Sequence, residues 1–242
     1  MIEIQNLIKS FGDVQAVKGL NLTVKDGEIF ALLGLNGAGK TTTIKILCTL
    51  LKKDGGKVFV NGLDLDEREK DIKRIISLSP QETAVALNLT VEENLKLIAA
   101  LYGITDENSA ETMIEKFSLT AKRKTLAKKL SGGQRRRLSL AMAFIVKPKI
   151  LILDEPTLGL DVKIRRELWR LIREFAESSN STVLFTTHYL EEAETFATRI
   201  GIMKSGELVA TGTATEITAS ADAKNFEDAF LLLAGDSGEE NE

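Results

Sequence analysis

A glycine-rich stretch from Gly34 to Thr42 has the residue types needed to bind phosphate. It reads Gly-Leu-Asn-Gly-Ala-Gly-Lys-Thr-Thr, which fits the pattern Gly-x-x-x-x-Gly-Lys-Thr. Glycines permit a tight loop that directs backbone N–H groups at an anion. Lys40 can reach the β- and γ-phosphates of a nucleotide, and the hydroxyl of Thr41 can bind Mg²⁺. The sequence therefore predicts a site for a nucleoside triphosphate. Its binding residues would be Asn36, Gly37, Ala38, Gly39, Lys40, Thr41 and Thr42.

Two adjacent carboxylates are a second candidate for chemistry. Asp154 and Glu155 follow the apolar run Ile150–Leu153, which is typical of a strand buried on both faces. Carboxylates at such a position are costly to bury without a positive partner. A metal ion and an attacking water would account for both, because Asp154 would support Mg²⁺ and Glu155 would orient or deprotonate the water.

Regular elements must hold these two sites in place. The phosphate-binding stretch follows the apolar run Ile29–Leu33 and precedes a segment with helical spacing of apolar residues, which is the strand–loop–helix order that the pattern requires. Alternating apolar residues predict two strands before it, at 2–8 and 20–24. We also expect strands at 58–60, 75–79, 150–153 and 182–187, a hairpin at 200–210, a charged helix at 64–73 and an amphipathic helix from 226.

The stretch from about Thr90 to Lys147 has a helical pattern. Thr90 and Glu93 are spaced as a capping box ahead of an apolar face. Ser131 is a natural N-cap, and the two glycines that follow it expose backbone N–H groups at the start of another helix. This second segment is either another anion-binding helix terminus or a capped helix that follows a turn.

Composition limits the classes of partner. The formal net charge of −3 gives no global basic field for nucleic acid, and the basic residues at 122–124 and 128–129 are read as a solvated face. The single cysteine, Cys48, excludes an intrachain disulfide. No apolar run approaches the roughly 20 residues that span a bilayer. We therefore expect a cytoplasmic protein that binds no nucleic acid.

These motifs, in this order, resemble those of the nucleotide-binding domain of ATP-binding cassette (ABC) transporters over nearly the whole chain. Gly34–Thr42 resembles Walker A, and Ile150–Glu155 resembles Walker B with its catalytic glutamate. Residues 130–134 have the wording of the signature motif, Leu-Ser-Gly-Gly-Gln. Leu158–Asp161 is similar to the D-loop. Three single residues match further family positions: Phe11 the adenine-stacking A-loop, Gln81 the Q-loop, and His188, the only histidine, the switch histidine.

The resemblance implies a fold. It is an α/β, P-loop NTPase core with a mixed, largely parallel sheet, an N-terminal antiparallel β-subdomain and an inserted α-helical subdomain at about 83–146. Residues 1–233 would form this single domain, and 234–242 a flexible acidic tail.

The resemblance also implies ATP hydrolysis with Mg²⁺, in sites that two chains share. Two copies, or one copy and a paralogous subunit, would dimerise head-to-tail around two ATP molecules. The signature residues Ser131, Gly132, Gly133 and Gln134 and the D-loop residue Asp161 of one chain would then meet the nucleotide that Lys40 of the other chain holds. The implied catalytic residues are Glu155, His188 and Gln81, and the implied Mg²⁺ ligands are Thr41, Gln81 and Asp154.

Within the family, the sequence of the phosphate-binding loop and the segment Phe226–Phe230 are most similar to those of one group of ATP-binding subunits. These subunits belong to half-systems for export of drugs, lipids, polysaccharides or ions. Such a subunit would drive separately encoded transmembrane subunits from the cytoplasmic face of the membrane. The chain has no length for the C-terminal β-domain of many importer ATPases. The alternative is a soluble ABC ATPase that acts on ribosomes or nucleic acid, but such proteins usually carry two cassettes or a long coiled-coil insertion, and this sequence has neither.

Overall fold

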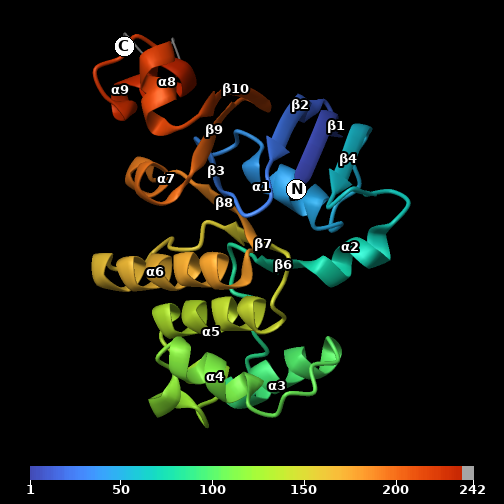
Figure 1. Cartoon of the computed structure of the whole chain (residues 1–242), viewed down its shortest axis with the longest axis vertical. Helices are drawn as coiled ribbons and strands as arrows, with labels where there is room; N and C mark the ends of the chain where they lie inside the picture. Colours follow the sequence, from blue (N-terminus) through green and yellow to red (C-terminus); the bar gives the residue numbers. More distant parts are fainter. Residues whose placement is uncertain (236–242) are drawn as a thin grey trace. The chain divides into compact units, whose positions relative to one another are not determined.

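The computed structural model describes residues 1–235, which divide into two compact units (Figure 1). The first unit comprises residues 1–72 and the chain from residue 184 onward, and the second comprises residues 73–183. Helix α2 (Glu69–Ile75) and strand β8 (Thr182–Thr187) each contain a boundary between the units. None of the helices in the described part of the chain combines the length and the hydropathy of a membrane span.

The N-terminal sheet of the first unit is antiparallel, as predicted. Strand β1 pairs with β2 on one side and with β4 on the other. Ile2 and Ile4 of β1 are buried, so alternate residues of the strand face the core. The sheet has the order β2-β1-β4-β5, with bounds β1 Ile2–Phe11, β2 Val14–Val24, β4 Gly55–Val60 and β5 Leu63–Asp64.

A second set of strands in this unit carries the phosphate-binding loop. Strand β3 (Ile29–Gly34) is buried along its whole length and pairs in parallel with β9 (Arg199–Lys204). Strand β9 forms the predicted hairpin with β10 (Glu207–Gly212). The strand order is β10-β9-β3-β8. The helices of this unit are α1 Lys40–Leu47, α7 Leu190–Phe196, α8 Ala214–Ser220 and α9 Phe226–Ala234.

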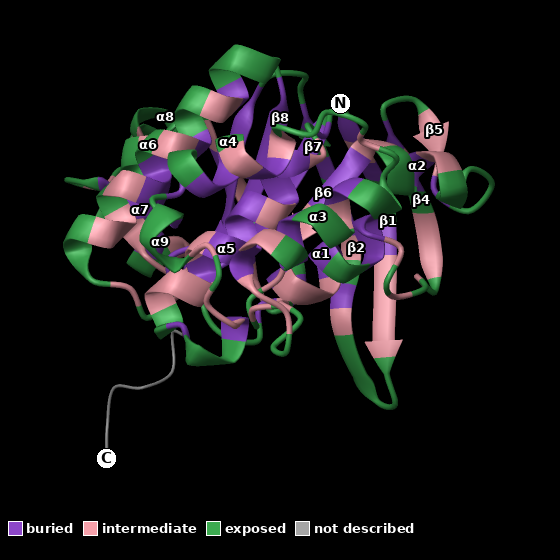
Figure 2. Cartoon of the chain, turned by 90° about the horizontal axis from the view of Figure 1, so that it is seen from below, coloured by how far each residue is buried: buried purple, intermediate pink, exposed green. Residues whose placement is uncertain are grey.

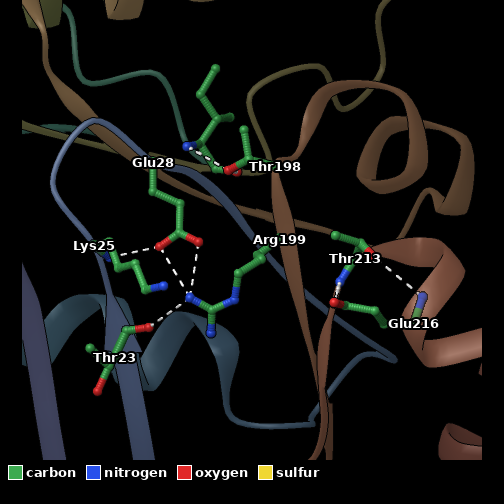
Figure 3. Close-up of polar contacts among 8 residues, drawn as sticks. Thr23, Lys25, Glu28, Thr198, Arg199, Thr213 and Glu216 are labelled. Carbon is green, nitrogen blue, oxygen red and sulfur yellow. Dashed lines mark hydrogen bonds and ion pairs between the residues drawn. The ribbon is translucent and has the colours of Figure 1, made fainter. Parts of the chain in front are cut away.

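An ion pair fixes β9 beside the start of β3 (Figure 3). The side chain of Glu28 is only 7% exposed, and one of its carboxylate oxygens lies 2.9 Å from Arg199 Nη1. The other oxygen accepts the backbone N–H of Lys25 at 2.6 Å. The hydroxyl of Thr198 donates to the carbonyl of Ile29 at 3.0 Å. These contacts hold the strand that leads into the phosphate-binding loop.

The second unit combines two parallel strands with a helical segment. Strand β6 pairs with β7 from Ile76↔Ile150 to Ser79↔Leu153. Helix α5 lies beside α6 and also contacts α3 and α4 (Figure 1). Much of α5 is buried (Figure 2). The elements are β6 Ile76–Ser79, β7 Ile150–Asp154, α3 Val91–Leu101, α4 Ser109–Lys116, α5 Gly132–Ile145, α6 Val162–Ser179 and the 3-10 helices Thr120–Lys122 and Ala127–Lys129.

Charged contacts stabilise the helical segment. The capping box that the sequence predicts for α3 is confirmed, because the hydroxyl of Thr90 accepts the N–H of Glu93 and the Glu93 carboxylate accepts the N–H of Thr90. Arg123 lies 2.9 Å from a carboxylate oxygen of Glu92 on α3 and 2.5 Å from one of Glu111 on α4. The arginine therefore connects two helices.

The helix expected at 64–73 is wrong over residues 64–68. Asp64 belongs to β5 instead, where it pairs with Phe59. Its carboxylate then accepts the backbone N–H of Asp66, a local bond that favours a turn over a helix. Helix α2 consequently begins at Glu69. Of the predicted tail at 234–242, only Ala234, the last residue of α9, and Gly235 lie within the described residues.

Candidate active site

The phosphate-binding loop connects β3 to α1 in the first unit. Gly37 and Gly39 have φ angles of 82° and 100°, which side chains rarely permit. Lys40 is 5% exposed, and its ammonium donates to the carbonyls of Gly34 at 2.6 Å and Leu35 at 3.0 Å. The lysine therefore bends back over the loop, which places a positive charge beside the loop carbonyls at the start of a helix.

The loop is held by the strands around it. A Cβ atom added to Gly39 would lie 2.5 Å from the carbonyl oxygen of Ala16, which belongs to β2. The N–H of Gly206, in the turn of the β9–β10 hairpin, donates to the carbonyl of Ala38 at 3.0 Å. The loop thus has a fixed backbone shape before any ligand arrives, which lowers the entropy cost of binding.

Two other predicted site residues lie in the same unit. Phe11 ends β1 with half of its surface exposed, and the ammonium of Lys9 lies 5.5 Å from its ring centre. An exposed aromatic face is available for stacking on a base. His188 follows β8, half-buried, with its ring centre 4.2 Å from that of Tyr189.

The paired carboxylates lie at the end of β7 in the second unit. Asp154 is 4% exposed and Glu155 is 9% exposed. Glu155 also has a φ angle of 46°, in the left-handed region that residues with a Cβ seldom adopt. Strained backbone of this kind is concentrated at functional sites, where the surrounding structure enforces it.

The signature residues begin α5. Ser131 is the N-cap, and its hydroxyl accepts the N–H of Gln134 while the Gln134 side chain accepts the N–H of Ser131. Ser131 and Gly132 are exposed, and a Cβ atom added to Gly132 would meet nothing within 4 Å. The structure thus presents an accessible helix N-terminus, a geometry that favours anions.

A cavity of about 400 Å³ brings together three of the predicted motifs within the second unit. It is lined by Gln81 after β6, by Gly132 at the start of α5, and by the loop that ends at Asp161. Asp161 caps α6, because its carboxylate accepts the N–H of Ile164 at 3.0 Å. The remaining residues of the lining are Glu82, Thr83, Arg135, Arg136, Leu158, Gly159 and Leu160.

Sequence reasoning missed Arg136. It lies between two other arginines, yet it is only 4% exposed and all its hydrogen bonds go to backbone carbonyls. Burial lowers the pKa of its guanidinium to about 10, although the carboxylates of Asp154 and Glu155 favour the charged form. The sequence does contain one signal for this burial. Arg136 lies four residues before the apolar Leu140, so the two side chains share one face of the helix.

Comparison with known proteins identifies the class to which this fold and these motifs belong. The model of the ABC transporter family matches residues 17–158. The chain therefore belongs to the ABC transporter family, and it is an ATP-binding ATPase subunit of this family.

Its relatives agree with this assignment. The chain is 39% identical to the daunorubicin/doxorubicin resistance ATP-binding protein DrrA of Streptomyces peucetius, over 98% of this chain and 76% of that protein. It is 37% identical to the linearmycin resistance ATP-binding protein LnrL of Bacillus subtilis, over 90% of this chain and 70% of that protein. These relatives support a transporter subunit over the alternative of a soluble ATPase acting on ribosomes or nucleic acid.

Solved structures share the fold. The ATP-binding subunit of an ABC transporter superposes with a TM-score of 0.88 and 27% identity, over 96% of this chain and 99% of that one. A dimeric ATP-binding cassette in a post-hydrolysis state, bound to ADP and phosphate, gives a TM-score of 0.81 at 27% identity, over 88% of this chain and 98% of that one. The predicted α/β class with its antiparallel and largely parallel sheets is confirmed.

Proposed function

We propose that the protein hydrolyses ATP as a head-to-tail dimer and that the dimer drives separately encoded transmembrane subunits. The observation that carries the proposal is the accessible N-terminus of α5 at Ser131 and Gly132. This helix terminus attracts an anion, yet the chain already has a phosphate-binding loop after β3. A γ-phosphate held by a second chain gives the α5 terminus a ligand, and the similar cassette with bound ADP and phosphate is dimeric.

In the proposed site, Lys40 and the loop from Asn36 to Thr42 bind the phosphates, and Phe11 stacks on the adenine. Glu155 orients the attacking water and His188 contacts the γ-phosphate. Gln81 connects the reacting centre to the helical segment at about 83–146, which we propose as the region that meets the membrane subunits. Positioning and charge neutralisation supply most of the rate acceleration in phosphoryl transfer.

The proposed Mg²⁺ ligands suit this ion chemically. The hydroxyl of Thr41, the amide oxygen of Gln81 and the carboxylate of Asp154 are all oxygen donors, which Mg²⁺ prefers. Asp154 is only 4% exposed. A bound cation would offset the free-energy cost of burying its carboxylate. When bound, the ion would neutralise charge on the β- and γ-phosphates.

We further propose that the transport is export, with the subunit on the cytoplasmic face of the membrane. The supporting observation is that two relatives carry names of drug-resistance ATP-binding proteins. The dimer partner is a second copy of this chain or a paralogous subunit. The domain from 1 to 233 would act as one cassette in this assembly.

The test uses Glu155→Gln, which preserves the shape of the side chain but removes the base. Light scattering should show a monomer without nucleotide and a dimer with Mg-ATP. Gly132→Asp in the same background should stay monomeric while it still binds ATP, because an added Cβ meets no atom within 4 Å and the new carboxylate would repel a γ-phosphate. Ser109→Asp places the same charge at the first residue of α4 and should still dimerise. An ATP-induced dimer of Gly132→Asp would contradict the shared site.

A further inference from the structure

Arg136 joins two loops that carry proposed catalytic residues. Its Nε donates to the carbonyl of Pro156 at 2.7 Å, and its Nη2 donates to those of Asp154 at 2.9 Å and Glu155 at 2.8 Å. Its Nη1 donates to the carbonyls of Pro80 at 2.5 Å and Gln81 at 3.3 Å. A guanidinium has five N–H groups, so every one of them has a backbone acceptor.

The first group of carbonyls encloses the strained backbone of Glu155. Three successive residues, with Glu155 in the middle, turn their carbonyls toward one guanidinium. The left-handed φ of Glu155 costs about 1–2 kcal/mol. A planar, rigid fork of donors is suited to hold such a turn, because the bonds fix the orientation of each peptide as well as its position. The direction of the Glu155 carboxylate depends on these peptides.

The second group of carbonyls belongs to the segment that follows β6. Strands β6 and β7 are parallel neighbours, with Ser79 opposite Leu153. Pro80 and Gln81 therefore leave the sheet at the same edge as Asp154 and Glu155. Arg136 lies one helical turn after the N-terminus of α5, so one side chain connects the signature helix, the Gln81 segment and the Glu155 turn.

We propose that Arg136 is a positioning residue for ATP hydrolysis, which fixes the backbone of Glu155 and of Gln81 so that their side chains are aligned for attack on the γ-phosphate. This inference rests on the roles given to Glu155 and Gln81 in the proposed function. Arg136 touches neither nucleotide nor water in this scheme, and its effect passes through the two peptides.

The test compares Arg136→Lys with Arg137→Lys. Arg137 is the adjacent arginine of α5 and pairs with Glu167 at 2.7 Å, so its replacement is a matched control. A lysine at 136 keeps the charge but offers donors from a single nitrogen, which cannot reach both groups of carbonyls. Arg136→Lys should lower kcat by about 10- to 100-fold, the scale of a displaced catalytic group. The KM and the Kd for ATP should stay within about 2-fold, and Arg137→Lys should change neither kcat nor KM by more than this.

Combination with Glu155→Gln tests whether Arg136 acts through Glu155. If it does, Arg136→Lys should lower the residual kcat of Glu155→Gln by clearly less than it lowers the wild-type kcat, because residues that act as a unit are not additive and only the effect through Gln81 remains. A full additional loss in the double variant would overturn the proposal. An unchanged kcat in Arg136→Lys would also overturn it, while a normal kcat in Glu155→Gln would instead overturn the proposed role of Glu155.

Hydrogen exchange supplies a readout of the two loops themselves. Amide exchange in segments 80–83 and 155–158 should speed up together in Arg136→Lys and stay unchanged in Arg137→Lys. If Arg136→Lys and Arg136→Gln both lose ATP binding or cooperative unfolding, the residue supports folding as a whole and the proposal is wrong.

Discussion

The ammonium of Lys40 lies 2.6 Å from the carbonyl oxygen of Gly34. Gly34 is the first residue of the phosphate-binding loop, and Lys40 follows its last glycine. The lysine is therefore held on the loop itself, in a buried position beside the phosphate-binding backbone. A nucleotide would find the charge already near its binding place, and little reorganisation would be needed.

Replacement of Lys40 tests the importance of this charge. Lys40→Ala should lower kcat/KM for ATP by at least about 100-fold, since it removes a preorganised cation from the phosphate site. Lys45→Ala removes an exposed lysine from the same helix and should leave the rate unchanged. Steady-state phosphate release measures both variants, and equal rates for the two would refute a special role for Lys40.

Two glycines of the loop should respond differently to alanine. Gly37→Ala has open space around its new methyl group, so its cost is the left-handed backbone alone, about 1–2 kcal/mol of unfolding free energy. Gly39→Ala has the same backbone cost and also places Cβ 2.5 Å from the carbonyl oxygen of Ala16. We therefore expect a larger loss of stability and of ATP affinity in Gly39→Ala. Urea unfolding and nucleotide titration will rank the two, and the reverse order would be inconsistent with the structure.

The ion pair between Glu28 and Arg199 should stabilise the first unit (Figure 3). Glu28→Ala removes the acceptor of the bonds from Lys25 and Arg199 and leaves the guanidinium partly buried, so we expect a loss of about 1–3 kcal/mol in the free energy of unfolding. Glu67→Ala, at an exposed position, should change it by less than about 0.5 kcal/mol. Chemical denaturation distinguishes these values, and similar losses in both variants would assign no stabilising role to the pair.

Glu92 should make the stability of the helical segment depend on pH. Hydrogen bonds from Arg123 and then Lys96 lower the pKa of its carboxyl from 4.5 to about 2. A lowered pKa in the folded state means that the charged form stabilises the fold fully above about pH 4.5, and that this contribution disappears as the pH falls toward 2. The difference in unfolding free energy between wild type and Glu92→Gln should thus be constant from pH 7 to 5.

Below that range the difference should shrink, which unfolding curves between pH 4.5 and 3 will detect. Arg123→Gln removes the principal partner and should weaken the same pH dependence. A difference that stays constant down to pH 3 would show that Glu92 does not gain stability from its ionised form.

Local patterns predicted most of the fold. The buried strand β7 was evident because its apolar run is continuous, and the start of α3 because Thr90 and Glu93 satisfy each other within one turn. The start of α2 was not, because β4 and β5 form a short hairpin that extends to Asp64 in place of a helical turn. The Asn61-Gly62 pair between the two strands is a local signal for such a hairpin, and the charged residues that follow it favoured a helix instead.

The motifs of the proposed site are taken from the sequence, but two parts of the local geometry were not evident there. The left-handed backbone of Glu155 is one, because no residue type in the segment indicates it. Arg136 is the middle one of three consecutive arginines, and residue type alone does not distinguish it from its neighbours. Its burial depends on five carbonyls that come from two loops, and the sequence separates those loops by more than 70 residues.

The N-cap of α5 has a further consequence for the choice of residue at position 131. Aspartate caps a helix as well as serine does, and it would also complement the helix dipole. A hydroxyl differs in that its oxygen can accept the N–H of Gln134 while its own proton remains available to an acceptor outside the helix. The two side chains would therefore give the helix a similar stability. Serine at this position is therefore compatible with the negatively charged group that we propose beside the helix terminus, which an aspartate would repel.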